Sequence, residues 1–209
     1  MSTPICIVDY GVGNVASVQN MLKKAGHTAV LSGDPEVVAH SAKVILPGVG
    51  AYDRAAAMLR QTGLGEAVRA AAAAGSSILG ICLGMQLLLD GSEEGSGAEP
   101  GLGLIPGRVR RFPADIERSG LKVPHMGWNT IRRSGAAGGL PSVRDGARYY
   151  FVHSYYADPD ESGDRLAVTT HGIEFASMLC RDNVVAAQFH PEKSHRAGMA
   201  LLSDFASAA

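Results

Sequence analysis

Residues 77–86 read Ser77-Ile78-Leu79-Gly80-Ile81-Cys82-Leu83-Gly84-Met85-Gln86, an apolar run that predicts a buried strand and turns at the cysteine into a helix-like segment. The small residues on both sides of Cys82 permit a sharp strand-to-helix turn, which lifts the side chain between them above the sheet and into the open. Unpaired N–H groups at the start of a helix favour negative charge nearby. We therefore predict that Cys82 is a nucleophile and that the N–H of Leu83 donates to an oxyanion.

The segments around this turn predict an α/β fold. Before it, strand-like and helix-like runs alternate, which is typical of a parallel sheet with helices on its faces. After about residue 100 the pattern changes to short strands, which we predict to be antiparallel, at 107–112, 128–133, 148–156, 165–171, 175–180 and 184–189. The expected fold is a central, mostly parallel sheet flanked by helices with an antiparallel extension, in a single domain covering residues 1–209.

Composition excludes several classes of function. The chain has 19 Lys and Arg against 20 Asp and Glu, so its net charge of −1 gives no reason to expect nucleic acid or an anionic membrane as partner. No apolar run is long enough for a membrane span, and we expect a cytoplasmic protein. Seven histidines are present, but no helical His-x3-His or Cys-x2-Cys pair, so a metal site is not expected.

A second chemical signal follows the last strand candidate, in Gln188-Phe189-His190-Pro191-Glu192-Lys193-Ser194. His190 and Glu192 are two residues apart, so in an extended segment their side chains project to the same side. A thiol nucleophile needs such a pair, because the imidazole carries the proton and the carboxylate fixes the tautomer of the ring. We predict a triad of Cys82, His190 and Glu192.

The loop Pro47-Gly48-Val49-Gly50 follows the third strand candidate, at the edge where α/β sheets gather their ligands. Its glycines allow a backbone N–H to turn toward a substrate oxygen. We predict that Val49 and Gly50 complete an oxyanion hole with Leu83, although an ordinary turn between a strand and a helix would have the same sequence.

Another loop favours a different function. Residues 11–16, Gly11-Val12-Gly13-Asn14-Val15-Ala16, follow a strand, open a helix and fit a relaxed dinucleotide-binding pattern, with Asp34 at a plausible distance for a ribose. A dinucleotide-binding domain is therefore an alternative, although such a domain would not need the Cys82 turn. A non-catalytic subunit that keeps the fold only as an interaction surface is a third possibility.

Taken together, these motifs resemble the class I, triad-type glutamine amidotransferases. Within that family the resemblance is to the glutaminase subunits of imidazole glycerol phosphate synthase, and it extends from residue 9 to residue 194. Beyond the segments already quoted, it is carried by Asp9-Tyr10-Gly11-Val12-Gly13-Asn14, Pro124-His125-Met126-Gly127-Trp128-Asn129 and Tyr150-Phe151-Val152-His153-Ser154-Tyr155. A glutaminase subunit of another amidotransferase is the nearest alternative.

The resemblance implies an activity, a partner and further site residues. Glutamine would be hydrolysed to glutamate and ammonia, and the ammonia would pass to a (β/α)8 cyclase subunit in a heterodimer that makes imidazole glycerol phosphate in histidine biosynthesis. No cofactor is implied. By motif position, the residues that hold glutamine are Gln86, Glu94, Ser154 and Tyr155, and those that face the cyclase are Asn14, Trp128, Tyr150 and Lys193.

Overall fold

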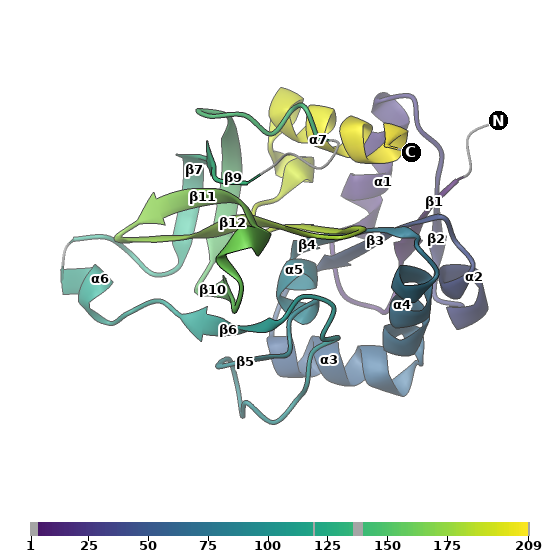
Figure 1. The fold of residues 1–209 in the computed structure, drawn as a ribbon, viewed down its shortest axis with the longest axis horizontal. Coiled ribbons are helices and arrows are strands. Elements are labelled where there is room, and N and C mark those ends of the chain that lie inside the picture. Colours follow the sequence, from purple (N-terminus) through teal and green to yellow (C-terminus); the bar gives the residue numbers. More distant parts are fainter. Residues whose placement is uncertain (1–3, 119, 136–139, 209) are drawn as a thin grey trace.

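Strands and helices alternate along the first half of the chain (Figure 1). The computed structural model describes residues 4–118, 120–135 and 140–208. As far as the turn at Cys82, its elements are β1 (Ile5–Val8), α1 (Val15–Lys24), β2 (Ala29–Ser32), α2 (Pro35–Ala39), β3 (Lys43–Gly48), α3 (Tyr52–Gln61), α4 (Leu64–Ala73), β4 (Ser77–Cys82) and α5 (Leu83–Leu87). Beyond it they are β5 (Gly91–Ser92), β6 (Gly107–Arg111), α6 (Asp115–Arg118), β7 (His125–Thr130), β8 (Arg132–Arg133), β9 (Arg148–His153), β10 (Tyr155–Pro159), η1 (Ser162–Asp164), β11 (Arg165–His171), β12 (Ile173–Arg181), β13 (Val184–Ala187), η2 (Pro191–Lys193) and α7 (His195–Ser207).

The larger sheet joins both halves of the chain. In the described ranges its strand order is β2-β1-β3-β4-β13-β12-β10-β6-β5, and β11 and β8 extend it from β12. The strands from β2 to β13 are parallel to one another, and β12, β10 and β6 continue the sheet by antiparallel pairing. The predicted fold class, a mostly parallel α/β sheet with an antiparallel extension, is confirmed.

The prediction that every late strand is antiparallel is wrong for β13. This strand is antiparallel to β12, but it lies parallel to β4, with Ala187 opposite Ile81. Because the carboxyl ends of parallel strands meet at one edge of a sheet, the segment after β13 arrives beside the end of β4. The pairing of β13 with β4 therefore brings the region of His190 to Cys82.

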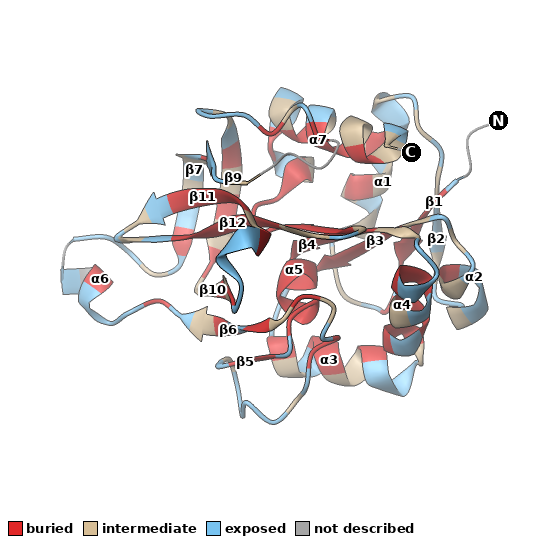
Figure 2. Cartoon of the chain, viewed as in Figure 1, coloured by how far each residue is buried: buried red, intermediate tan, exposed pale blue. Residues whose placement is uncertain are grey.

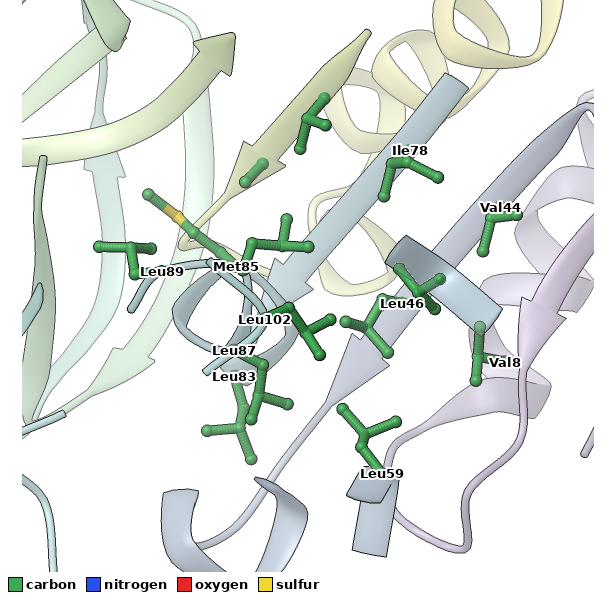
Figure 3. Close-up of a cluster of buried hydrophobic side chains, with 14 of the residues drawn as sticks. Val8, Val44, Leu46, Leu59, Ile78, Leu83, Met85, Leu87, Leu89 and Leu102 are labelled. Carbon is green, nitrogen blue, oxygen red and sulfur yellow. The ribbon is translucent and has the colours of Figure 1, made fainter. Parts of the chain in front are cut away.

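Helices cover both faces of the parallel strands (Figure 1). On β3 the pleat sends Val44 and Leu46 into the layer filled by α3, α4 and α5, and sends Ile45 into the layer filled by α1 and α7. Figure 2 shows buried residues along the sheet and on the helix surfaces that face it. Figure 3 shows the first of these layers, in which Leu59 and Leu83 lie near the side chains of the sheet.

Two predicted strands are divided in the structure. The run 148–156 breaks at Ser154, because β9 pairs with β7 in a separate two-stranded sheet whereas β10 pairs with β6 in the large sheet. The run 128–133 is likewise split between β7 and β8, which pairs with β11. Within the ranges given above, we find no helix with both the length and the apolar character that crossing a membrane requires.

Candidate active site

The turn at Cys82 has an unusual backbone conformation. Cys82 has φ 55° and ψ −110°, and α5 begins at the next residue. A non-glycine residue in such a region costs roughly 1–3 kcal/mol, so the surrounding packing must hold it there. Added Cβ atoms would overlap the carbonyl oxygen of Leu46 at Gly84 and lie 2.6 Å from the Leu88 side chain at Gly80. Both glycines are needed because α5 packs this closely on β3 and β4.

The prediction that the turn lifts Cys82 into the open overestimates the solvent exposure of this side chain. The residue is only 7% exposed, because α5 and the loops after β3 and β9 close around it. It lines a cavity of about 590 Å³. The predicted residues that line the same cavity are Asn14, Val49, Gly50, Leu83, Gln86, Glu94, Ser154, Tyr155, His190 and Lys193.

The structure brings the three residues of the predicted triad together. Nδ1 of His190 is 2.8 Å from Oε1 of Glu192, and both side chains are 2% exposed. Cys82 and His190 line the same cavity, and Cys82 is close enough to act on the pKa of the ring. Burial lowers the pKa of His190, but its interactions with Cys82 and Glu192 outweigh burial and raise that pKa to about 9. At neutral pH the ring therefore holds a proton beside the thiol.

The reason that we gave for the His190–Glu192 pair is wrong. The two residues do not lie in an extended segment, because Glu192 belongs to the 3-10 helix η2 and β13 has already ended at Ala187. The tight turn brings the carboxylate back to the ring. The backbone N–H of His190 donates to the carbonyl of Tyr150 at 2.9 Å, which fixes the turn to β9.

The loop after β3 is tightly packed at Pro47–Gly48 and exposed at Val49–Gly50. Tyr10 donates its hydroxyl proton to the Pro47 carbonyl at 2.8 Å, and a Cβ on Gly48 would meet Tyr10, Leu83 and Gly84 within 3 Å. Val49 is 39% exposed. Gly50 has φ 98°, and a Cβ there would meet no heavy atom of the described residues within 4 Å, apart from those of its two chain neighbours. The loop thus has room to change its conformation beyond Gly48.

Side-chain amides form one wall of the cavity. Gln86 is 5% exposed, and its Nε2 donates to the Tyr155 carbonyl at 3.2 Å and to Oε1 of Gln188 at 3.1 Å. Nε2 of Gln188 in turn lies 3.9 Å from the sulfur of Cys82. We did not single out Gln188 from the sequence, although it stands two residues before His190 in the motif that we quoted.

Glu94 lies at the other side of the cavity, on a segment tied to α3. Its Oε2 accepts from the backbone N–H of Tyr52 at 3.3 Å, and Asp53 accepts from the N–H and the hydroxyl of Ser96. Burial raises the pKa of Glu94, against the hydrogen bond from Tyr52. A half-buried carboxylate at this place suits the ammonium group of an amino acid.

The four residues predicted to face a partner form a continuous surface from the cavity mouth. Asn14 and Lys193 line the cavity, and Lys193 lies over the ring of Tyr150 at 5.8 Å. Trp128 is opposite Tyr150 in the β7–β9 sheet, is 40% exposed, and stacks on His195 with the ring centroids 5.3 Å apart. Exposed aromatic rings beside a cavity are typical of a surface that binds another protein.

Comparisons with known proteins agree with this geometry. Residues 6–209 match the family described as glutamine amidotransferase class-I. The imidazole glycerol phosphate synthase subunit HisH of Geobacter metallireducens is 47% identical over 204 residues, which cover 97% of each chain. That of Moorella thermoacetica is 48% identical over 204 residues, 97% of this chain and 93% of the relative. The chain belongs to the class I glutamine amidotransferases, in the branch of the HisH subunits.

Solved structures share this fold. The structure of PurLQS from Thermotoga maritima has a chain that matches with a TM-score of 0.76 at 18% identity, covering 98% of both chains. Another, described as a glutamine amidotransferase, matches with a TM-score of 0.72 at 20% identity, covering 95% of this chain and 98% of the other. At such identities the likeness concerns the fold alone.

Membership of the class I glutamine amidotransferases leaves the dinucleotide hypothesis without support. The carboxylate of Asp34, which we considered for a ribose, instead caps α2 by accepting the N–H of Glu36 at 3.0 Å. A Cβ on Gly11 would lie 3.0 Å from the side chain of Met58, so the loop is already packed against α3. In the described parts of the chain, no group of three or more His, Cys, Asp or Glu side chains could hold a metal ion.

Two buried histidines, of which His153 lines the cavity, were not predicted as site residues. His125 and His153 are 4% and 6% exposed, and Nδ1 of His125 lies 3.0 Å from Nε2 of His153. The pKa of His125 is lowered to about 4 by burial and by the charge of His171. Burial lowers that of His153 to about 3, against the hydrogen bond to the Tyr155 carbonyl. Both rings are therefore neutral in the folded chain at pH values where exposed histidines become charged.

The low pKa values of these two histidines predict a loss of stability in mild acid. In the unfolded chain they titrate near ~6.5, so the unfolded state binds more protons below that pH and the free energy of unfolding falls as pH falls. From pH ~7 to pH ~5 we expect a loss on the order of 2 kcal/mol per histidine, measured by urea unfolding. The double variant His125→Gln, His153→Asn lacks both groups and should show a flatter profile. If the free energies of unfolding of the wild type and the double variant changed equally with pH, the lowered pKa values would not belong to these two histidines.

Proposed function

We propose that residues 1–209 form one cytoplasmic amidotransferase domain that hydrolyses glutamine with Cys82, His190 and Glu192. The observation that carries this proposal is the hydrogen bond of the His190 ring to the Glu192 carboxylate, with Cys82 and His190 together at the wall of a cavity that fits an amino acid. Because its relatives are subunits of imidazole glycerol phosphate synthase, the ammonia would be delivered to a (β/α)8 cyclase subunit in a heterodimer.

The chemistry begins with attack of the Cys82 sulfur on the side-chain amide carbon of glutamine. A protonated His190 within hydrogen-bond reach stabilises the thiolate, and Glu192 stabilises the charged ring. The oxyanion that forms would accept hydrogen bonds from the N–H of Leu83 and from one N–H of the Val49–Gly50 loop. His190 then gives its proton to the departing nitrogen, so that ammonia leaves and a glutamyl thioester remains.

Water completes the reaction. His190, now neutral, removes a proton from a water molecule that attacks the thioester carbon, and the products are glutamate and the free thiol. Glu94 and the Ser154–Tyr155 backbone would hold the amino-acid end of glutamine, since both border the cavity. Ammonia must stay neutral to react at the cyclase, which favours a dry exit across the surface of Asn14, Trp128, Tyr150 and Lys193.

A glutaminase assay of the chain combined with its cyclase partner tests the proposal, and unequal losses are expected in two variants. His190→Ala removes the proton carrier. Glu192→Gln keeps an oxygen that accepts from Nδ1 of His190, so its loss of kcat should be smaller by about one to two orders of magnitude. Single-turnover rates of thioester formation compare the two directly. Near-wild-type activity in His190→Ala would show that the proposed catalytic triad is wrong.

A further inference from the structure

We propose that His153 is a positioning residue for glutamine, which it serves by holding the backbone carbonyl of Tyr155 at the cavity wall through a hydrogen-bonded relay. The proposal rests on the proposed glutaminase function and adds a residue that does not touch the reacting atoms. The relay runs from Asn129 on β7 through His125 to His153 on β9, and ends at Tyr155, the first residue of β10.

Each link of the relay is a hydrogen bond of ordinary length. Nδ2 of Asn129 lies 3.2 Å from Nε2 of His125, whose Nδ1 is 3.0 Å from Nε2 of His153. Nδ1 of His153 is 2.7 Å from the Tyr155 carbonyl oxygen. The same oxygen accepts from Gln86, so the relay and the amide wall of the cavity meet at one atom.

The partners at the two ends fix the position of every proton. A carbonyl oxygen only accepts, so Nδ1 of His153 must carry the hydrogen and its Nε2, in a neutral ring, must accept. The hydrogen shared with His125 therefore belongs to Nδ1 of His125. Nε2 of His125 is then an acceptor, which matches the amide N–H of Asn129. The relay is complete only when both rings are neutral and both carry their hydrogen on Nδ1.

The surroundings keep the rings neutral. Phe112, Phe151 and Phe175 pack around His153 with ring centroids 5.1 to 5.8 Å apart. The other titratable groups that act on the pair are His171, which stacks on His125 at 4.2 Å, and His190, whose positive charge opposes a second charge nearby. Neither carries a negative charge, so nothing in this group of side chains stabilises a protonated His125 or His153.

The relay acts where the chain changes sheets. His153 pairs with His125 in the small sheet, and Tyr155 pairs with Arg111 in the large one, with Ser154 between them in neither. At this junction the Ser154 carbonyl accepts from the backbone N–H of Phe112 at 3.4 Å, a long bond that holds the backbone only weakly. The hydrogen bond from His153 to the Tyr155 carbonyl links the two sides of this junction, and so fixes the backbone that faces the amino-acid end of glutamine.

Two substitutions at His153 separate positioning from packing. In His153→Asn the amide Nδ2–H replaces Nδ1–H and can still donate to Tyr155, whereas in His153→Leu the donor is lost and an apolar side chain remains. We expect His153→Leu to raise KM for glutamine about tenfold, the effect of one hydrogen bond, with a smaller change in kcat, and His153→Asn to restore KM to near the wild-type value. The rate at which iodoacetamide alkylates Cys82 should stay unchanged in both variants.

The outcomes distinguish this proposal from the proposed function. If the wild-type complex does not hydrolyse glutamine, the function itself is wrong. If the wild type is active and His153→Leu keeps the wild-type KM, or if His153→Asn and His153→Leu are impaired equally, the positioning role is wrong.

The proton positions can be tested without any variant. In ¹⁵N spectra of the histidine side chains of the full chain, His125 and His153 should both appear as neutral rings with protonated Nδ1 and bare Nε2 from pH ~6 to ~8. A neutral His153 with its proton on Nε2 cannot donate to Tyr155 through Nδ1 and would overturn the relay.

Discussion

Replacing Cys82 by alanine is expected to lower glutamine hydrolysis by at least about three orders of magnitude, because a thioester cannot form without the thiol. Cyclisation supported by added ammonia should continue at the wild-type rate in the complex, since the cyclase chemistry does not use this thiol. Glutamate release and ammonia-supported product formation are measured on the same preparation. Glutamine turnover above a few per cent of wild type would exclude Cys82 as the nucleophile.

A second substitution at the same position controls for effects on folding. Cys82 has φ 55°, where a side chain is strained and glycine is not. Cys82→Gly should therefore be more stable than Cys82→Ala, although both lack the thiol and both should be inactive. Equal loss of hydrolysis with different free energies of unfolding would assign the loss to chemistry. If activity instead followed stability across the two variants, the loss would have a structural cause.

The residues around Cys82 could be predicted because their signals are local. Gly80 and Gly84 flank the nucleophile within one continuous segment, and the structure needs both for the close approach of α5 to the sheet. The same holds for the amphipathic and apolar runs that became α1, β3 and α4, which belong to the alternating part of the chain before Cys82. Short-range pattern and backbone sterics decide these elements.

Other parts of the site depend on contacts between distant segments. Nothing in the sequence of β13 says that it lies parallel to β4, because that pairing is decided by the whole order of the sheet. The relay of His125 and His153 was missed for the same reason, since each histidine looks like an ordinary polar residue in its own strand. The division of 148–156 at Ser154 likewise follows from two different partner strands. Local periodicity carries no information on which strands pair.

Binding of the cyclase partner with its substrate is expected to raise kcat for glutamine hydrolysis by roughly two to three orders of magnitude. The reason lies in the Val49–Gly50 loop. Tyr10 fixes the carbonyl of Pro47, but beyond Gly48 the loop is exposed, and among the described residues only the chain neighbours of Gly50 lie within 4 Å of the position of a Cβ there. A peptide between these residues can turn over at little steric cost, so the free subunit can leave the second oxyanion donor pointing away.

The size of the activation follows from the energy of one donor. Removing one oxyanion-hole hydrogen bond costs ~3–4 kcal/mol, which corresponds to a factor of about 10² to 10³ in rate. Docking on the surface of Asn14, Trp128 and Lys193 would favour the loop conformation that directs an N–H at the oxyanion, because Asn14, Lys193 and the loop border the same cavity. The gain should appear mostly in kcat, since the carbonyl of bound glutamine benefits less than the oxyanion.

Steady-state kinetics of the free subunit and of the complex, with and without cyclase ligand, measure this activation. Gly50→Ala perturbs the loop, because alanine rarely adopts the φ of 98° found at Gly50. Gly26→Ala is the matched control, since it makes the same change at another exposed glycine of positive φ, after α1. We expect Gly50→Ala to change the factor by which the ligand-bound complex raises kcat, and Gly26→Ala to leave that factor unaltered. Equal kcat for the free subunit and the ligand-bound complex would mean that the oxyanion hole is already built in the free chain.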